Sequence, residues 1–168
     1  NGVNLHKEAI NVLKEISKRG KDYILLTNAP RPNKIVKSFL EKMGMEKEIR
    51  EHVFTSGEAS LNYLKKYLIG KNFFHVGPPR DFDLFNDFKK MKLESIKDSE
   101  YILCTGLFEG YDDNLNYYKN LFENNLEKKM ICTNPDLIVD RGNTRELCAG
   151  SVAMVFEKMG GNVIYFGK

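Results

Sequence analysis

Apolar segments typical of buried strands alternate with amphipathic helical segments along the chain, and this alternation limits the folds that it can adopt. The apolar runs lie at residues 23–26, 73–76, 101–104, 130–132 and 163–166. Such runs, bounded by turn residues, are typical of strands inside a sheet that is covered on both faces. Strands that alternate with helices predict βαβ units and parallel sheets, and therefore an α/β fold.

The helical segments show apolar residues at helical spacing, and turn residues mark several of their ends. Thr55-Ser56-Gly57-Glu58 matches a capping box, which predicts the start of a helix that runs to about residue 68. Asp81-Phe82-Asp83 predicts acids in the first turn of a helix, where the helix dipole favours them. The region around 141–143 predicts a Gly/Asn-rich loop. The expected helices span residues 6–19, 35–43, 56–68, 81–91, 112–126 and 147–159.

Polar residues follow several strands at the point where each strand ends. Thr27-Asn28, Thr105-Gly106 and Thr133-Asn134 all stand at such positions. In open α/β sheets, ligands bind outside the carboxyl ends of the strands, and a hydroxyl with a free backbone N–H suits a phosphate oxygen. Thr27 is therefore a candidate phosphate-binding residue, although this short run alone favours a turn residue that caps the next helix.

Charge and cysteine usage exclude several classes of protein. The net charge of +3 is small and the charged residues are interspersed, which argues against nucleic-acid binding. No apolar run approaches the roughly 18 residues of a membrane span. Cys104, Cys132 and Cys148 have no metal-binding spacing and indicate reduced thiols in a cytoplasmic protein. The three histidines are isolated, so a zinc site is not expected.

The order of these segments resembles the haloacid dehalogenase-like hydrolases, and more narrowly their class IIA, the NagD and nitrophenylphosphatase-like group with a large α/β cap. The resemblance runs along nearly the whole chain, and it is the series, not any single piece, that is specific. The pieces are Leu25-Leu26-Thr27-Asn28-Ala29-Pro30, Val53-Phe54-Thr55-Ser56, His75-Val76-Gly77, Cys132-Thr133-Asn134-Pro135-Asp136, Cys148-Ala149-Gly150 and Tyr165-Phe166-Gly167-Lys168.

The resemblance implies a Mg²⁺-dependent phosphatase for a small phosphorylated metabolite that works through an aspartyl-phosphate intermediate. Thr27 matches the phosphate-binding hydroxyl, and Asn28 matches the residue whose backbone N–H assists it. Lys168 matches the lysine that completes the phosphate cradle, so Thr27 and Lys168 are the expected catalytic residues of this chain. The nucleophilic Asp and the Mg²⁺ ligands of the family should lie before Asn1 and after Lys168. We therefore expect a chain truncated at both ends, without metal ligands and inactive by itself.

The resemblance also implies two domains. Residues 1–69 with 162–168 should form a partial Rossmann-like hydrolase core, and residues 70–161 an inserted α/β cap that selects the substrate. Asn134, Asp136, Arg141 and Arg145 are the candidate substrate contacts of this cap, although loop solvation explains them equally well. Caps of this kind also allow a homodimer.

Two other classes of function remain open. A non-catalytic phospholigand-binding or regulatory protein could use the same fold, since fold does not fix function. A nucleotide-binding enzyme of another doubly wound family is disfavoured, because the sequence has no G-x-G-x-x-G after a strand and no P-loop. A protein-interaction module is a weaker alternative, because the aromatic residues fit core positions.

Overall fold

The structure is a computed structural model that describes residues 4–142 and 144–168. Its helices and strands alternate, which confirms the predicted α/β fold. The first part holds α1 (Lys7–Lys18), β1 (Leu25–Thr27), α2 (Asn33–Lys42), α3 (Lys47–Arg50), β2 (Val53–Thr55) and α4 (Ser56–Tyr67). The second part holds β3 (Phe73–Val76), the 3-10 segment η1 (Pro79–Met91), β4 (Lys92–Leu93), β5 (Tyr101–Cys104), α5 (Leu115–Phe122), β6 (Lys129–Cys132), β7 (Ile138–Arg141), β8 (Thr144–Leu147), α6 (Ala149–Lys158) and β9 (Asn162–Tyr165).

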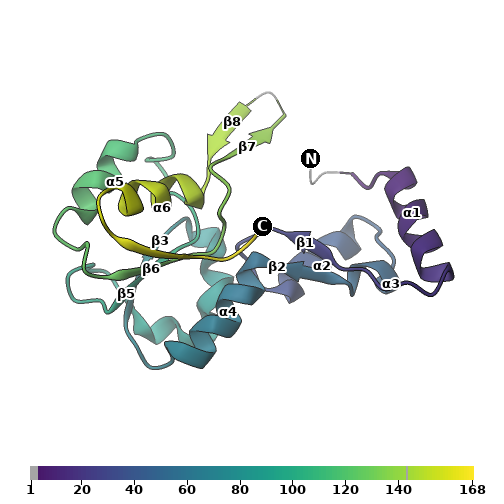
Figure 1. Ribbon diagram of the computed structural model, residues 1–168, viewed down its shortest axis with the longest axis horizontal. Helices are drawn as coiled ribbons and strands as arrows, with labels where there is room; N and C mark the ends of the chain where they lie inside the picture. Colours follow the sequence, from purple (N-terminus) through teal and green to yellow (C-terminus); the bar gives the residue numbers. More distant parts are fainter. Residues whose placement is uncertain (1–3, 143) are drawn as a thin grey trace.

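Two parallel sheets lie in separate parts of the molecule (Figure 1). The small sheet pairs β1 with β2, with Leu25 opposite Val53 and Thr27 opposite Thr55. The large sheet has five strands in the order β4-β3-β5-β6-β9. Residue 168 lies between the two sheets (Figure 1), next to the end of β1.

The last strand belongs to the large sheet. β9 pairs in parallel with β6, with Lys129 opposite Asn162 and Cys132 opposite Tyr165. The prediction that this strand lies with the first 69 residues is therefore wrong. The apolar run at 163–166 identified a buried-type strand, but a run of this kind does not say which sheet it joins.

Two apolar clusters cover the two faces of the large sheet. On one face, α5 and α6 bury Tyr118, Phe122 and Phe156 against alternate residues of β5 and β6. On the other face, Leu64 of α4 and Phe85 of η1 pack against the remaining residues of those strands. β5 is buried at every position, which confirms the prediction of a strand covered on both sides. Helix α4 therefore follows the small sheet in sequence but packs on the large one.

Strand β1 is much more exposed than its sequence predicts. Leu26 is 51% exposed and the preceding Ile24 is 57% exposed. The reason is that β2 is the only strand that pairs with β1 among the described residues. A strand in the middle of a wider sheet would bury both side chains.

Two other segments differ from their predicted structures. The segment after β3 is a 3-10 helix with non-helical backbone angles at Phe85 and Phe88, where their rings pack on Phe73. The segments on either side of the expected loop form a hairpin, in which β7 pairs antiparallel with β8, and Asn143 itself lies outside the described residues. The signal for this hairpin was present, because Gly-Asn between two short strands is typical of a tight connection.

Candidate functional site

The two sheets are joined by contacts between the loops at their carboxyl ends. Asn28 follows β1, Asp136 follows β6 and Lys168 follows β9. The Asn28 Nδ2 donates to Asp136 Oδ1 at 2.8 Å and to the Lys168 carbonyl at 3.0 Å. The Lys168 backbone N–H donates to Asn28 Oδ1 at 2.9 Å. One amide side chain thus brings together three segments at the edge where parallel sheets bind ligands.

Thr27 lies at the last position of β1, directly before this amide. Its Oγ1 accepts a hydrogen bond from the Ala29 backbone N–H at 3.3 Å. That contact uses an oxygen lone pair and leaves the hydroxyl proton free to donate to a ligand. Thr27 is partly exposed, so a ligand at this strand end could reach its hydroxyl.

The loop that follows Thr27 is held by the start of α4. The predicted capping contact is present, since Thr55 Oγ1 accepts from the Glu58 N–H at 2.9 Å. The same hydroxyl donates to the Arg31 carbonyl at 2.6 Å. Gly57 permits this approach, because a Cβ there would lie 2.3 Å from the Arg31 backbone nitrogen. The Glu58 carboxylate accepts from the Asn33 N–H at 2.8 Å, so the loop is fixed at both ends.

The loop after β6 also packs on a glycine of the following helix, but its threonine, Thr133, is buried. The Gly150 N–H donates to the Asp136 carbonyl at 3.1 Å, and a Cβ on Gly150 would lie 2.2 Å from the Pro135 carbonyl oxygen. Asn134 Oδ1 accepts from the Asp136 N–H at 3.0 Å and so orders its own loop. Thr133, however, is fully buried and donates to the Cys104 carbonyl at 3.3 Å.

Gly167 brings the end of β9 against both loops. It has a φ of +134°, and a Cβ there would lie 2.6 Å from Asn28 Oδ1 and 2.5 Å from Pro135 Cδ. The side chain of Lys168 is exposed beyond this contact. The structure therefore brings Thr27, Asn28, Asp136 and the Lys168 backbone into one region, which we call the junction.

The remaining predicted cap contacts lie on the hairpin that stands out from the large sheet (Figure 1). Arg145 Nε and Nη2 donate to the two Asp140 carboxylate oxygens at 2.8 and 3.2 Å. This hydrogen-bonded pair lowers the pKa of Asp140 and raises the pKa of Arg145. The guanidinium is thus paired with its own hairpin. The side chain of Arg141 lies outside the part of the chain that the structure describes.

A second polar cluster between the two parts of the molecule was not predicted from the sequence. Arg31 Nε lies 3.5 Å from Asp81 Oδ1, an ion pair that also joins the two parts of the molecule. Asp81 lies in the first turn of η1, as predicted, but it is buried. Burial raises the pKa of Asp81, while the Thr105 hydroxyl and the Arg31 charge act in the opposite direction. His75 Nε2 lies 2.8 Å from Thr105 Oγ1, and burial lowers the pKa of His75 to about 3.

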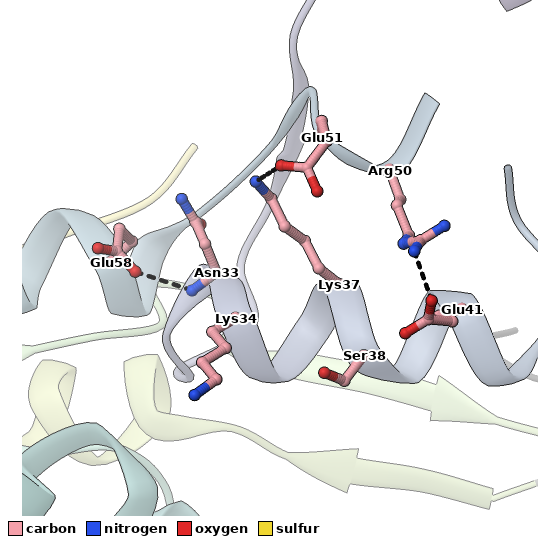
Figure 2. Close-up of a pocket in the computed structure, with 8 residues that line it drawn as sticks. All are labelled: Asn33, Lys34, Lys37, Ser38, Glu41, Arg50, Glu51 and Glu58. Atoms are coloured by element: carbon pink, nitrogen blue, oxygen red, sulfur yellow. Dashed lines mark hydrogen bonds and ion pairs between the residues drawn. The ribbon is translucent and has the colours of Figure 1, made fainter. Parts of the chain in front are cut away.

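A separate hollow lies away from the junction, between α2, α3 and the start of α4 (Figure 2). It has a volume of about 430 Å³ and is lined largely by charged side chains. Figure 2 shows that these charges pair with one another, Lys37 with Glu51 at 2.6 Å and Arg50 with Glu41 at 2.5 Å. The hollow is therefore a salt-bridged surface groove.

No metal site is found among residues 4–142 and 144–168. No group of three or more His, Cys, Asp or Glu residues there could hold a metal ion. Cys104 and Cys132 form no disulfide, and the hydrogen bond to Cys132 together with burial raises the pKa of Cys104 well above its ordinary value. No helix in the same residues has the length and apolar character needed to span a membrane.

Comparison with solved structures supports the same fold over the whole chain. A haloacid dehalogenase-like hydrolase from Brucella suis 1330 aligns with 28% identity and a TM-score of 0.85, over 100% of this chain and 62% of that chain. A p-nitrophenyl phosphatase from Archaeoglobus fulgidus aligns with 16% identity and a TM-score of 0.69, over 98% of this chain and 64% of its own. A 4-nitrophenylphosphatase from Thermotoga maritima aligns with 18% identity and a TM-score of 0.68, over 98% and 62% of the two chains.

The chain thus spans less than two thirds of the length of these proteins. No curated protein matches the sequence. A family model described as haloacid dehalogenase-like hydrolase matches residues 1–89, more than half of the chain. The chain therefore belongs to the haloacid dehalogenase-like hydrolases.

Proposed function

We propose that this chain is part of a Mg²⁺-dependent phosphatase that hydrolyses a small phosphorylated metabolite through an aspartyl-phosphate intermediate. The observation that carries the proposal is the contact of Asn28 with the backbone of Lys168. This contact holds the two segments that the family uses for phosphate next to one another. The phosphatase names of the relatives from Archaeoglobus fulgidus and Thermotoga maritima agree with this chemistry.

In this proposal the residues of the chain bind and orient the phosphate. The Thr27 hydroxyl and the Asn28 backbone N–H donate to phosphate oxygens, and the Lys168 ammonium balances their charge. The Asn28 amide is already committed to Lys168 and Asp136, so it fixes the position of these groups before substrate binds. Such preorganised donors cost no rearrangement at the moment of reaction.

The described residues do not form a Mg²⁺ site, and we derive no step from the metal. We propose that the nucleophile and the metal ligands lie outside residues 1–168, which by themselves would not hydrolyse substrate. The half-exposed Leu26 and Ile24 support a further strand beside β1. Residues 70–161 together with β9 form the proposed cap, and the buried reduced thiols of Cys104 and Cys132 favour the cytoplasm.

The test uses the full-length protein that contains this chain, with phosphate release from p-nitrophenyl phosphate measured with and without Mg²⁺. Thr27→Val and Lys168→Met should each lower kcat/KM by about 100-fold or more, the size of losing one oxyanion donor. Thr144→Val, which removes an exposed hairpin hydroxyl, is the matched control and should leave the rate unchanged. An active Thr27→Val variant would contradict the proposal. Phosphate binding without turnover would support the regulatory alternative instead.

A further inference from the structure

Arg31 is held by contacts with both parts of the molecule. Its backbone is held by α4, because the Arg31 carbonyl accepts from Thr55 Oγ1 at 2.6 Å. Its guanidinium meets Asp81 of the opposite part of the molecule through Nε, at 3.5 Å. The Arg31 side chain remains 34% exposed, whereas that of Asp81 is only 5% exposed. The ion pair therefore orients the guanidinium of Arg31, while about a third of the side chain stays accessible to solvent.

Asp81 belongs to a group of buried polar residues that includes His75 and Thr105. Burial lowers the pKa of His75 to about 3, so its ring is neutral at neutral pH. The Thr105 hydroxyl and the Arg31 charge act to lower the pKa of Asp81, against the larger effect of burial. Thr105 Oγ1 in turn lies 2.8 Å from His75 Nε2, within hydrogen-bond distance.

The geometry of the Arg31–Asp81 pair is poor for a purely structural ion pair. A strong pair would use two parallel N–H···O bonds, as Arg145 and Asp140 do on the hairpin. Here a single Nε–H faces the carboxylate at the limit of hydrogen-bond distance. No hydrogen bond or ion pair to the two terminal amino groups of Arg31 is found within residues 4–142 and 144–168. Those two amino groups can therefore donate parallel hydrogen bonds to two oxygens of an anion.

We infer that Arg31 recognises a second anionic group on the substrate, a carboxylate or a second phosphoryl, while His75, Thr105 and Asp81 position its guanidinium. The inference rests on the proposed function, because it places the first phosphate at Thr27. Arg31 follows Thr27 by four residues, so their backbones are at most about 14 Å apart, within reach of one small metabolite. The substrate class is therefore a phosphomonoester with a second negative charge.

The test measures binding and turnover by the full-length protein with two matched probes, 3-phosphoglycerate and the neutral-ended glycerol 3-phosphate. The wild type should bind 3-phosphoglycerate more tightly, as measured by calorimetry. Arg31→Gln should weaken that binding about 10- to 100-fold, the size of a lost charged hydrogen bond. The same variant should change the affinity for glycerol 3-phosphate by less than about threefold. Arg80→Gln, which removes the neighbouring exposed arginine, should leave both affinities unchanged.

Thr105 tests the positioning chain. Thr105→Val should raise the KM for 3-phosphoglycerate without lowering kcat, and Thr105→Ser, which keeps the hydroxyl, should restore the KM. Equal weakening of both probes by Arg31→Gln, or no weakening, would overturn the inference. Absence of turnover with every phosphomonoester would refute the phosphatase proposal alone. The inference about Arg31 would still be tested, because calorimetry measures the preference for 3-phosphoglycerate without turnover.

Discussion

Acid should destabilise the large sheet through the single histidine of β3. His75 is 3% exposed, and its pKa is lowered to about 3 by burial and, less strongly, by the charge of Lys92. In the unfolded chain the same ring has a pKa of 6.5. The unfolded state therefore takes up a proton as the pH falls below 6.5, while the folded state does not. The stability that His75 contributes is present above that pH and is lost as the pH falls toward 3.

The size of this loss follows from the difference between the two pKa values. At about 1.4 kcal/mol per unit, the free energy of unfolding should fall by about 2 kcal/mol between pH 7 and pH 5. Complete titration would cost about 5 kcal/mol. The raised pKa of Asp81 acts in the opposite direction, so the wild type alone does not isolate the histidine. Comparison with a variant that lacks the imidazole removes the contribution of Asp81.

The assay is urea unfolding of the full-length protein at pH 7 and pH 5, followed by circular dichroism, for the wild type and His75→Gln. The wild type should lose about 2 kcal/mol more than the variant over this range. His6→Gln removes a histidine that is exposed at the start of α1 and should keep the wild-type difference. Titration of the His75 ring protons by NMR gives a direct reading. A ring that titrates near pH 6.5, or equal losses in wild type and His75→Gln, would refute the reasoning.

Two further predictions concern the loop that carries Thr27. Gly57→Ala should destabilise the protein by about 1–3 kcal/mol, because its Cβ would lie 2.3 Å from the Arg31 backbone nitrogen. Asn62→Ala on the exposed side of the same helix is the control, and thermal unfolding that is equal for both variants would contradict this. Asn28→Asp places a second carboxylate about 2.8 Å from Asp136 and should weaken binding of inorganic phosphate at least tenfold at pH 7. The double variant Asn28→Asp/Asp136→Asn exchanges the two side chains and restores an amide–carboxylate contact, so it should recover the affinity for phosphate. If calorimetry shows no recovery, the assigned role of Asn28 is wrong.

The sequence predicted the strands of the large sheet well, because the apolar residues of these strands indicate burial on both faces of the sheet. β5 and residues 130–132 of β6 are continuous apolar runs, and both faces of the sheet are covered by helices. β1 has the same pattern but is exposed, since burial of a strand depends on neighbours that its own residues do not specify. The same limit explains why β9 was assigned to the wrong sheet.

The junction was predictable only in part. The strand-end rule identified Thr27 and Asn28, but the partners of Asn28 lie 108 and 140 residues away in the sequence. No local pattern pairs residues over such distances. His75 did carry a signal, because a polar residue inside a buried strand must find a partner. That partner, Thr105, follows the adjacent strand, and only the parallel register of β3 and β5 brings the two together.

The two Thr-Asn pairs show why a strand-end motif does not by itself define a site. Thr27 and Thr133 follow similar apolar runs, and each precedes a loop that packs on the glycine of a following helix. Thr133 ends an inner strand of the large sheet, and its hydroxyl is used by the Cys104 carbonyl of the neighbouring strand β5. Thr27 ends a strand with one neighbour, and its hydroxyl proton has no such acceptor among the described residues. The threonine of the same motif therefore stabilises the fold in one sheet and keeps its hydroxyl proton available to a ligand in the other.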